Sequence, residues 1–168
     1  MAGHVCRLAN HLWADVVLSR LSIMVTGLEV RPIALATAKT MIGQFHYART
    51  SPPITKYCLG LWKQERLLGV VLLGYGTRPL HTIKRLFSSL EVRNYLEINR
   101  LWVSDELPRN SESWFIARIL GWVRQYHPEV VLIFSWADGL RGKPGYIYQA
   151  TNFLYGGFIE SEFYITQE

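Results

Sequence analysis

Acid, phenol and cationic side chains gather in one stretch toward the carboxyl end of the chain. Residues 135–156 read SWADGLRGKPGYIYQATNFLYG and follow a strongly apolar, strand-like run. Asp138 can accept a hydrogen bond or a proton, and Tyr148 can act as a general acid or stack on a ring. Lys143 makes the glycine-rich turn between them basic. Such groups at the end of a buried strand predict a proton-transfer site for a substrate that resembles nucleic acid.

Each of these side chains also has a purely structural explanation. Asp138 can cap the turn at Gly139, Tyr148 can be an ordinary core residue, and Lys143 can belong to a solvated loop. Ser135 either orients Asp138 or satisfies backbone groups. The sequence leaves these alternatives open.

Two further candidates come from other predicted elements. Arg100 interrupts an otherwise apolar strand, so it either pairs with an acid such as Glu97 or holds a phosphate or donor group with its planar guanidinium. Ser111 and Ser113 open a helix whose first-turn N–H groups favour anions. Helix capping explains one of the two serines, and we keep Ser113 as the candidate site residue.

The spacing of apolar residues predicts the elements that must hold these groups. Leu35, Ala38, Ile42 and Phe45 recur at helical spacing, and residues 129–136 form a continuous apolar run typical of a central strand. The predicted elements are a strand at 28–31, a helix at 33–46, hairpin strands at 57–62 and 67–75, a strand at 95–104, a helix at 111–126, a strand at 129–136, a short helix at 144–153 and a hairpin-like region at 154–166. This order predicts one α/β domain.

The composition is that of one globular domain. The chain has 168 residues, of which 49% are hydrophobic, enough for a proper core. Its two cysteines cannot form a disulfide framework, and no Cys/His cluster suggests zinc, so a reducing cytoplasm is expected. Residues 12–25 are apolar, but Asp15 and Arg20 interrupt them, and the run is too short to span a membrane.

Positive charge is concentrated in the amino-terminal half. Residues 1–93 carry 12 Lys or Arg and four Asp or Glu, a net +8, whereas residues 94–168 carry six and nine, a net −3. This asymmetry predicts a face that docks on a phosphate backbone, with scattered surface charge as the alternative. The basic residues expected to contact phosphates are Arg49, Lys56, Lys63 and Arg66.

Residues 1–27 are predicted to be an N-terminal extension, and residues 28–168 to be the single domain. Met24 begins the segment MVTGLEVRPI, which is typical of the opening of a domain. A start codon set too far upstream would explain such an extension. The sequence leaves open whether residues 1–23 belong to the native protein.

The order of predicted elements resembles the GNAT acyltransferase fold, and the segment YQATNFLYGGF is similar to the closing part of that fold. The resemblance predicts a mixed, mostly antiparallel central sheet flanked by helices. GNAT enzymes bind the pyrophosphate of coenzyme A with a glycine-rich loop. Here residues 104–113, SDELPRNSES, contain no glycine, a proline that removes an N–H, and the acids Asp105 and Glu106. We therefore expect a donor other than coenzyme A.

Four longer motifs carry a closer resemblance. They are FHYAR (45–49), EINRLWVSDELPRNSESWF (97–115), SWADG (135–139) and GYIYQATNFLYGG (145–157). Together they are similar to the Mom family of bacteriophage DNA-modification proteins, over about residues 28 to 157. The resemblance implies conversion of adenine in DNA to a carbamoylmethyl derivative at its exocyclic amino group, which shields phage DNA from restriction. It also implies a phage- or prophage-encoded protein in the cytoplasm of a bacterial host, and an iron requirement. The group donor and the oligomeric state stay unknown.

The resemblance implies roles for nine residues. The implied catalytic residues are Asp138, Tyr148, Arg100, His46 and Ser113, and the implied substrate contacts are Tyr47, Ser135, Lys143 and Arg49. His46 would be a general base or, in an iron site, a metal ligand, rather than an ordinary surface or core histidine. The partner would be double-stranded DNA whose target adenine leaves the helix and lies against an aromatic wall. The aromatic candidates are Trp102, Trp136, Tyr146 and Phe153.

Two other functions remain in view. An acetyl-CoA-dependent GNAT N-acetyltransferase would act on an amine of a small molecule or protein and would bind acetyl coenzyme A. A non-catalytic DNA-binding module would bind DNA in a salt-dependent way and would be indifferent to the loss of Asp138 and Tyr148.

Overall fold

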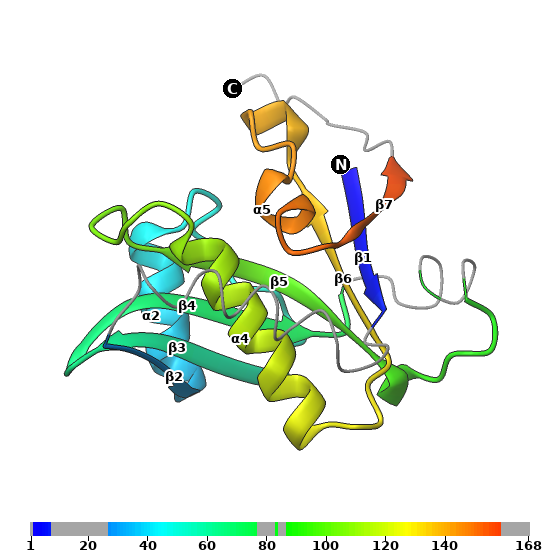
Figure 1. Ribbon diagram of the computed structural model, residues 1–168, viewed down its shortest axis with the longest axis horizontal. Coiled ribbons are helices and arrows are strands. Elements are labelled where there is room, and N and C mark those ends of the chain that lie inside the picture. The colour runs from blue at the N-terminus through cyan, green and yellow to red at the C-terminus, as the bar shows by residue number, and fades with distance from the viewer. Residues whose placement is uncertain (1, 8–26, 77–82, 84–86, 159–168) are drawn as a thin grey trace, which may run out of the picture.

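A mixed sheet of seven strands forms the centre of the protein within the residues that the structure describes (Figure 1). This computed structural model describes residues 2–7, 27–76, 83 and 87–158. In the order of the sheet, the strands are β2 (Leu28–Pro32), β3 (Tyr57–Lys63), β4 (Arg66–Gly74), β5 (Tyr95–Val103), β6 (Leu132–Ala137), β1 (Ala2–Arg7) and β7 (Leu154–Phe158). Only β5 and β6 pair in parallel among these strands. The predicted mixed, mostly antiparallel sheet is confirmed.

Two helices cover opposite faces of this sheet. Helix α2 (Leu35–Phe45) lies on one face and helix α4 (Ser111–Tyr126) on the other (Figure 1). Side chains of β4 alternate between these two faces. Val70 and Leu72 pack in the hydrophobic cluster under α2, and Val71 and Leu73 pack in the cluster under α4. The alternation explains why β4 is apolar along nearly its whole length. A short helix, α5 (Tyr146–Gln149), follows β6.

Most predicted elements are confirmed within one or two residues, and three differ. Strand β6 begins at Leu132 rather than at residue 129, because the chain after α4 turns where Val130 N–H donates to the carbonyl of His127 over 2.9 Å. Helix α5 has four residues and ends in further turns, so the predicted helix at 144–153 is too long. The strand at the start of the 154–166 region pairs with β1 instead of folding into a hairpin, and residues 159–166 lie outside the described residues.

Part of the predicted N-terminal extension is a strand of the sheet. Residues 2–7 form β1, which pairs antiparallel with both β6 and β7. Residues 8–26 lie outside the described residues. The boundary predicted at residue 28 stays a prediction.

The parallel strands β5 and β6 separate into a fork. Their pairing covers only Tyr95–Ile98 against Leu132–Ser135, although β5 continues to Val103 and β6 to Ala137. The register between β4 and β5 shifts at Asn99, which bends β5 just beyond the last parallel pair. At the apex of the fork, the hydroxyl of Ser135 donates to the carbonyl of Ile98 over 3.1 Å. Open α/β sheets place their sites beyond such strand ends.

No helix among the described residues is long and apolar enough to cross a membrane.

Candidate active site

A cleft of about 840 Å³ opens at this fork. Its walls come from the diverging halves of β5 and β6, the loop after α2, and the connection from β6 into α5. Six of the nine predicted site residues line the cleft, namely His46, Tyr47, Arg100, Asp138, Lys143 and Tyr148. The structure therefore brings together side chains from three separate segments of the sequence.

Asp138 lines the cleft just after the end of β6. It precedes a 3₁₀ turn, η2 (Gly139–Arg141), but its side chain makes no capping hydrogen bond. The turn is instead closed by the backbone, since the Asp138 carbonyl accepts hydrogen bonds from the N–H groups of Arg141 and Lys143, each over 3.1 Å. The side chain is half-buried and lies close enough to Tyr47 to raise the pKa of that phenol, after the larger effect of burial. The geometry favours a functional Asp138 over a turn cap.

His46 is a buried, neutral imidazole. It is 6% exposed, and its Nδ1 accepts a hydrogen bond from the N–H of Ala48 over 3.1 Å. Burial, and then the charges of Arg100 and Lys143, lower the pKa of His46 to about 4. With Nδ1 as acceptor, the neutral ring carries its proton on Nε2. These observations favour a hydrogen-bond donor over the predicted general base or metal ligand, both of which need a ring nitrogen with a free lone pair.

Arg100 anchors the loop after α2 to strand β5. Its Nε donates to the carbonyl of Thr50 over 2.9 Å, its Nη1 to the carbonyl of Asn99 over 2.6 Å, and its Nη2 to the hydroxyl of Thr50 over 3.4 Å. The sequence had suggested either an acid or a phosphate as its partner, and the structure places backbone carbonyls there. Because a guanidinium has five N–H donors, the side chain can still donate into the cleft that it lines.

Tyr148 and Ser135 form a buried pair at the base of the cleft. Tyr148 is 8% exposed, and burial raises the pKa of its phenol to about 12 against the opposing effect of a hydrogen bond with Ser135. The single proton of Ser135 points to Ile98, so the phenol is the donor in that bond. Of the two alternatives that the sequence left open for Ser135, its bond to the Ile98 carbonyl agrees with the one in which it satisfies a backbone group, and Ser135 also supports Tyr148. The neutral phenol is better suited to positioning a substrate than to exchanging protons near neutral pH.

Ser113 and Arg49 are not among the residues that line the cleft. Ser113 is buried on the inner side of α4, while the preceding Glu112 faces the cleft, since successive helical residues point about 100° apart. Arg49 is exposed in the loop after α2, where its N–H donates to the carbonyl of His46 over 2.9 Å. The catalytic role of Ser113 and the phosphate contact of Arg49 both stay predictions.

Glu97 lines the cleft but is not among the nine predicted site residues. Burial raises the pKa of its carboxyl, and hydrogen bonds from Asn99 and Trp136 and the charge of Arg100 oppose that shift. Gly76 makes room for it, because a Cβ at that position would collide with Oε2 of Glu97. A charged residue between Leu96 and Ile98, in a strand otherwise expected to be buried, was the available signal. A desolvated carboxyl in a cleft is a candidate acid or base.

Aromatic residues form much of the cleft wall. Trp102, Trp136 and Tyr146 line it, as predicted for an aromatic surface, together with Phe45. Phe153 does not, because it is buried in the core with its ring 5.4 Å from that of Tyr148.

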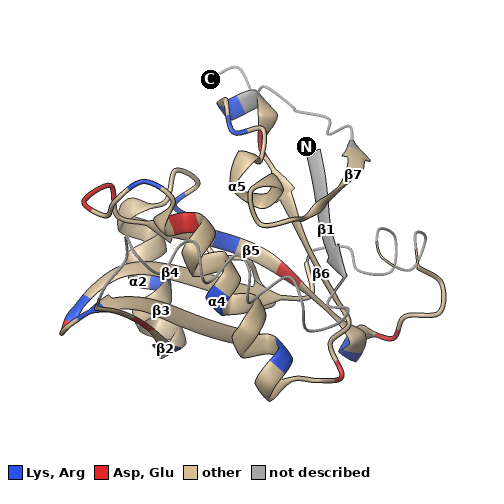
Figure 2. Ribbon diagram, in the orientation of Figure 1, with Lys and Arg blue, Asp and Glu red and all other residues tan. Residues whose placement is uncertain are grey.

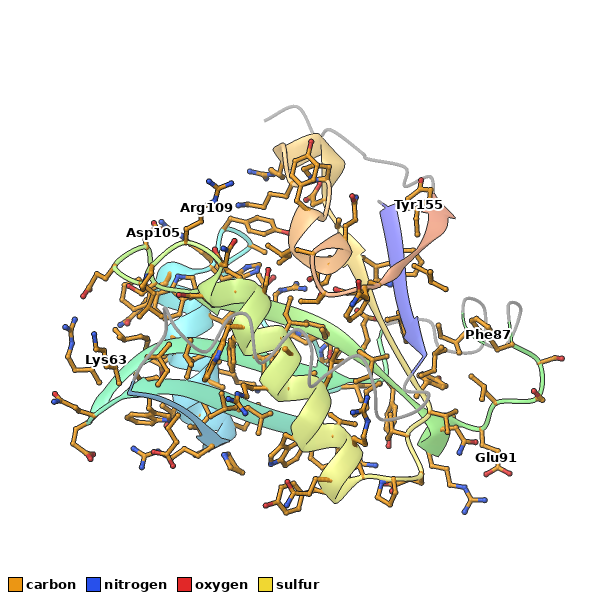
Figure 3. The ribbon with its side chains drawn as sticks, in the orientation of Figure 1. Lys63, Phe87, Glu91, Asp105, Arg109 and Tyr155 are labelled. Atoms are coloured by element: carbon orange, nitrogen blue, oxygen red, sulfur yellow. The ribbon has the colours of Figure 1, made fainter. Side chains whose placement is uncertain are left out.

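The basic residues near the cleft differ from those expected. Lys63 projects from the β3–β4 hairpin, far from α5 (Figure 3), and Arg66 pairs with Glu106 at 2.8 Å. Lys56 lies 5.2 Å from the centres of two tyrosine rings. Figure 2 instead shows Lys and Arg on the connection between β6 and α5, and Lys143 of this connection lines the cleft. The positive charge at the cleft thus comes partly from the acidic half of the sequence.

The described residues do not fit an iron centre. They contain no group of three His, Cys, Asp or Glu side chains placed to hold a metal ion. Nδ1 of His46 is also occupied by the Ala48 N–H, which leaves the proton on Nε2. We therefore assign no step of the chemistry to a metal.

The splayed parallel strands and the cleft between them define a protein with the GNAT fold. A GCN5-related N-acetyltransferase from Kribbella flavida superposes with a TM-score of 0.55 at 8% identity, over 93% of this chain and 54% of that one. A tandem GNAT protein from the clavulanic acid biosynthesis pathway gives a TM-score of 0.50 at 13% identity, over 90% and 49%. At these identities the likeness concerns the fold alone.

Within that fold, the chain belongs to the Mom protein family, whose model matches residues 27–168. It is 37% identical over 137 residues to the protein named methylcarbamoylase mom of Escherichia phage Mu. The alignment covers 82% of this chain and 56% of the phage Mu protein, so the chain spans little more than half the length of that relative. The family resemblance predicted from the four motifs is confirmed.

Proposed function

We propose that this chain modifies DNA by placing a carbamoylmethyl group on the exocyclic amino nitrogen of adenine. The observation that carries the proposal is membership of the Mom family, with a relative whose name describes a methylcarbamoylase. The cleft supports it, since carboxylates, hydrogen-bond donors and aromatic rings converge at one fork. Acting in the cytoplasm of a bacterial host, the protein would make phage DNA resistant to restriction.

The chemistry needs a group that takes a proton from a weak nucleophile. The lone pair of the adenine amino nitrogen is delocalised into the ring, so the enzyme must bind the amino group and remove a proton as the new N–C bond forms. Asp138 is suited to accept that proton, because its carboxylate is not used by the adjacent turn. The donor supplies the carbamoylmethyl carbon, and its leaving group departs with the electron pair of the broken bond.

A second carboxyl group, that of Glu97, is suited to giving a proton to the leaving group. Because burial raises the pKa of Glu97, this side chain holds its proton more readily than an exposed glutamate and can pass it to the leaving group. Its neighbour Asn99 also lines the cleft, and a hydrogen bond from the Asn99 side chain opposes the rise in the pKa of Glu97. His46 Nε2–H and Arg100 can donate to the oxygen of the transferred carboxamide.

We propose that the donor is not coenzyme A. In the connection from β5 to α4, backbone N–H groups that a pyrophosphate would need are bound within the loop. The N–H of Glu106 donates to the hydroxyl of Ser104 over 3.3 Å, and the N–H of Leu107 donates to the carbonyl of Ser104 over 3.1 Å. Asp105 from this connection and Glu112 from the first turn of α4 line the cleft and would repel phosphate.

Nucleoside mass spectrometry of DNA from cells that express the protein tests the function. The wild-type chain is expected to produce a nucleoside heavier than deoxyadenosine by one carbamoylmethyl group, and Asp138→Asn to reduce it by about a hundred-fold or more, the low end of what one acid–base group contributes. Glu65→Gln is the matched control, because Glu65 is an exposed acid beside the β3–β4 turn. An acetylated product would instead indicate an acetyltransferase, and unmodified DNA from cells with soluble protein would refute the proposal.

A further inference from the structure

Three exposed aromatic side chains surround the mouth of the cleft. Phe45 is 53% exposed, Tyr47 is 46% exposed and Tyr146 is 73% exposed, and all three line the cleft. They come from the end of α2, the loop after it, and the first residue of α5. Single exposed rings are common on protein surfaces, but three at one opening form a local apolar surface that calls for a ligand.

Two of these rings are held in place by their neighbours. The ring of Phe45 stacks on that of Trp102, with centroids 4.8 Å apart and planes 18° apart. The ring of Tyr47 stacks on that of His46 at 4.3 Å and 30°. Stacked rings are ordered before any ligand binds, so a further flat group can add to the stack at little cost in conformational entropy.

Positive charge lies between and beside the rings. The ammonium of Lys143 is 5.6 Å from the centre of the Tyr47 ring, a contact between the two sides of the mouth. Arg141 belongs to the same connection, and Arg49 follows Tyr47 in the loop after α2; both are exposed. On the third side lie the acids Asp105, from the β5–α4 connection, and Glu112, from the first turn of α4. Alternating rings and cations are the features of surfaces that bind single-stranded nucleic acid, where rings stack on bases and cations follow the phosphates.

We propose that the mouth of the cleft binds an unpaired stretch of DNA, with the target base inside and its neighbours stacked on the rings of Phe45 and Tyr146. This inference rests on the proposed function and adds the form of its substrate. In a closed duplex the faces of the bases are covered by neighbouring bases, so no free base face is available to stack on the exposed rings. Single-stranded or locally opened DNA offers free faces and spares the enzyme the cost of unpairing the target.

Fluorescence anisotropy with short labelled oligonucleotides tests the inference without any group donor. The probes are a single strand with one adenine, its perfect duplex, and the same duplex with that adenine mismatched. The single strand is expected to bind about ten-fold more tightly than the duplex, the effect of roughly one added base–aromatic stack, with the mismatch between them.

Tyr146→Ala should weaken binding of the single strand about ten-fold and leave the perfect duplex unchanged. Tyr146→Phe keeps the ring and should bind like the wild type. Tyr126→Ala is the matched control, because Tyr126 is 57% exposed at the far end of α4 and does not line the cleft. Equal binding of single strand and duplex, or an equal loss for both in Tyr146→Ala, would overturn the inference. A single-strand preference in a protein that leaves adenine unmodified would refute the proposed function and leave this inference standing.

Discussion

The buried imidazole of His46 should make the protein less stable in mild acid. Its pKa is about 4 in the folded protein and 6.5 in the unfolded chain, so the unfolded chain takes up the proton first as pH falls. The folded state therefore loses stability between about pH 6.5 and pH 4. A shift of this size corresponds to about 3 kcal/mol once both states are protonated, and to about 2 kcal/mol at pH 5.

The variant His46→Asn isolates this effect. An asparagine Oδ1 can accept the Ala48 N–H that Nδ1 accepts at 3.1 Å, as in an Asx turn, and it does not titrate. Urea unfolding followed by tryptophan fluorescence gives the free energy of unfolding of both proteins at pH 7, 6 and 5. From pH 7 to pH 5, the free energy of unfolding of the variant minus that of the wild type should increase by about 2 kcal/mol. All other titrating groups are shared by the two proteins, so their contributions cancel. If the two proteins lose stability in parallel, His46 is not the buried neutral group described above.

Two further substitutions test the carboxyl and the phenol at the base of the cleft. Because burial raises the folded-state pKa of Glu97 above 4.5, its ionisation costs stability as pH rises through that range. The stability of Glu97→Gln relative to wild type should therefore increase from pH 4 to pH 7 in urea unfolding while nucleoside modification falls; a pH-independent difference would contradict the assignment. Tyr148→Phe removes the hydrogen bond to Ser135 and should cost about 1 kcal/mol of stability. Since the phenol has a pKa of about 12, the variant's pH–activity profile should keep its shape up to mildly alkaline pH, and loss of an alkaline limb would show that Tyr148 exchanges a proton in the reaction.

The helices and strands could be predicted from the sequence because their signals are local. The period of apolar residues in α2 and the continuous apolar run of β4 depend on neighbours within one element. Strand β6 was placed three residues too early because apolar residues continue into the preceding turn, and Val130 is buried there without being part of a strand. An apolar run indicates burial, and burial does not distinguish the end of a strand from a turn packed on the core.

The site was predicted in part, and the errors concern partners that are distant in sequence. Arg100 binds Thr50, fifty residues away, and no residue near it in the chain signals that partner. Ser135 binds Ile98 because β5 and β6 are parallel neighbours, a pairing that depends on the whole crossover through α4. Asp138 could be found because its position after a buried strand is a local signal. Glu97 had only a weak local signal, a charge between two apolar residues, because its surroundings come from Gly76 and Trp136, which are distant in sequence.

The hydroxyl of Ser135 has a mechanical consequence for the cleft. It accepts the phenol of Tyr148 and donates to Ile98, so α5, β6 and β5 meet at one oxygen atom at the apex of the fork. The two strands diverge beyond this atom, with Arg100 farther along β5 and Asp138 just after the end of β6. A small displacement at the apex would therefore produce a larger displacement at the outer ends of β5 and β6. Ser135 can thus influence the distance between the Asp138 carboxylate and the Arg100 guanidinium without contacting either group.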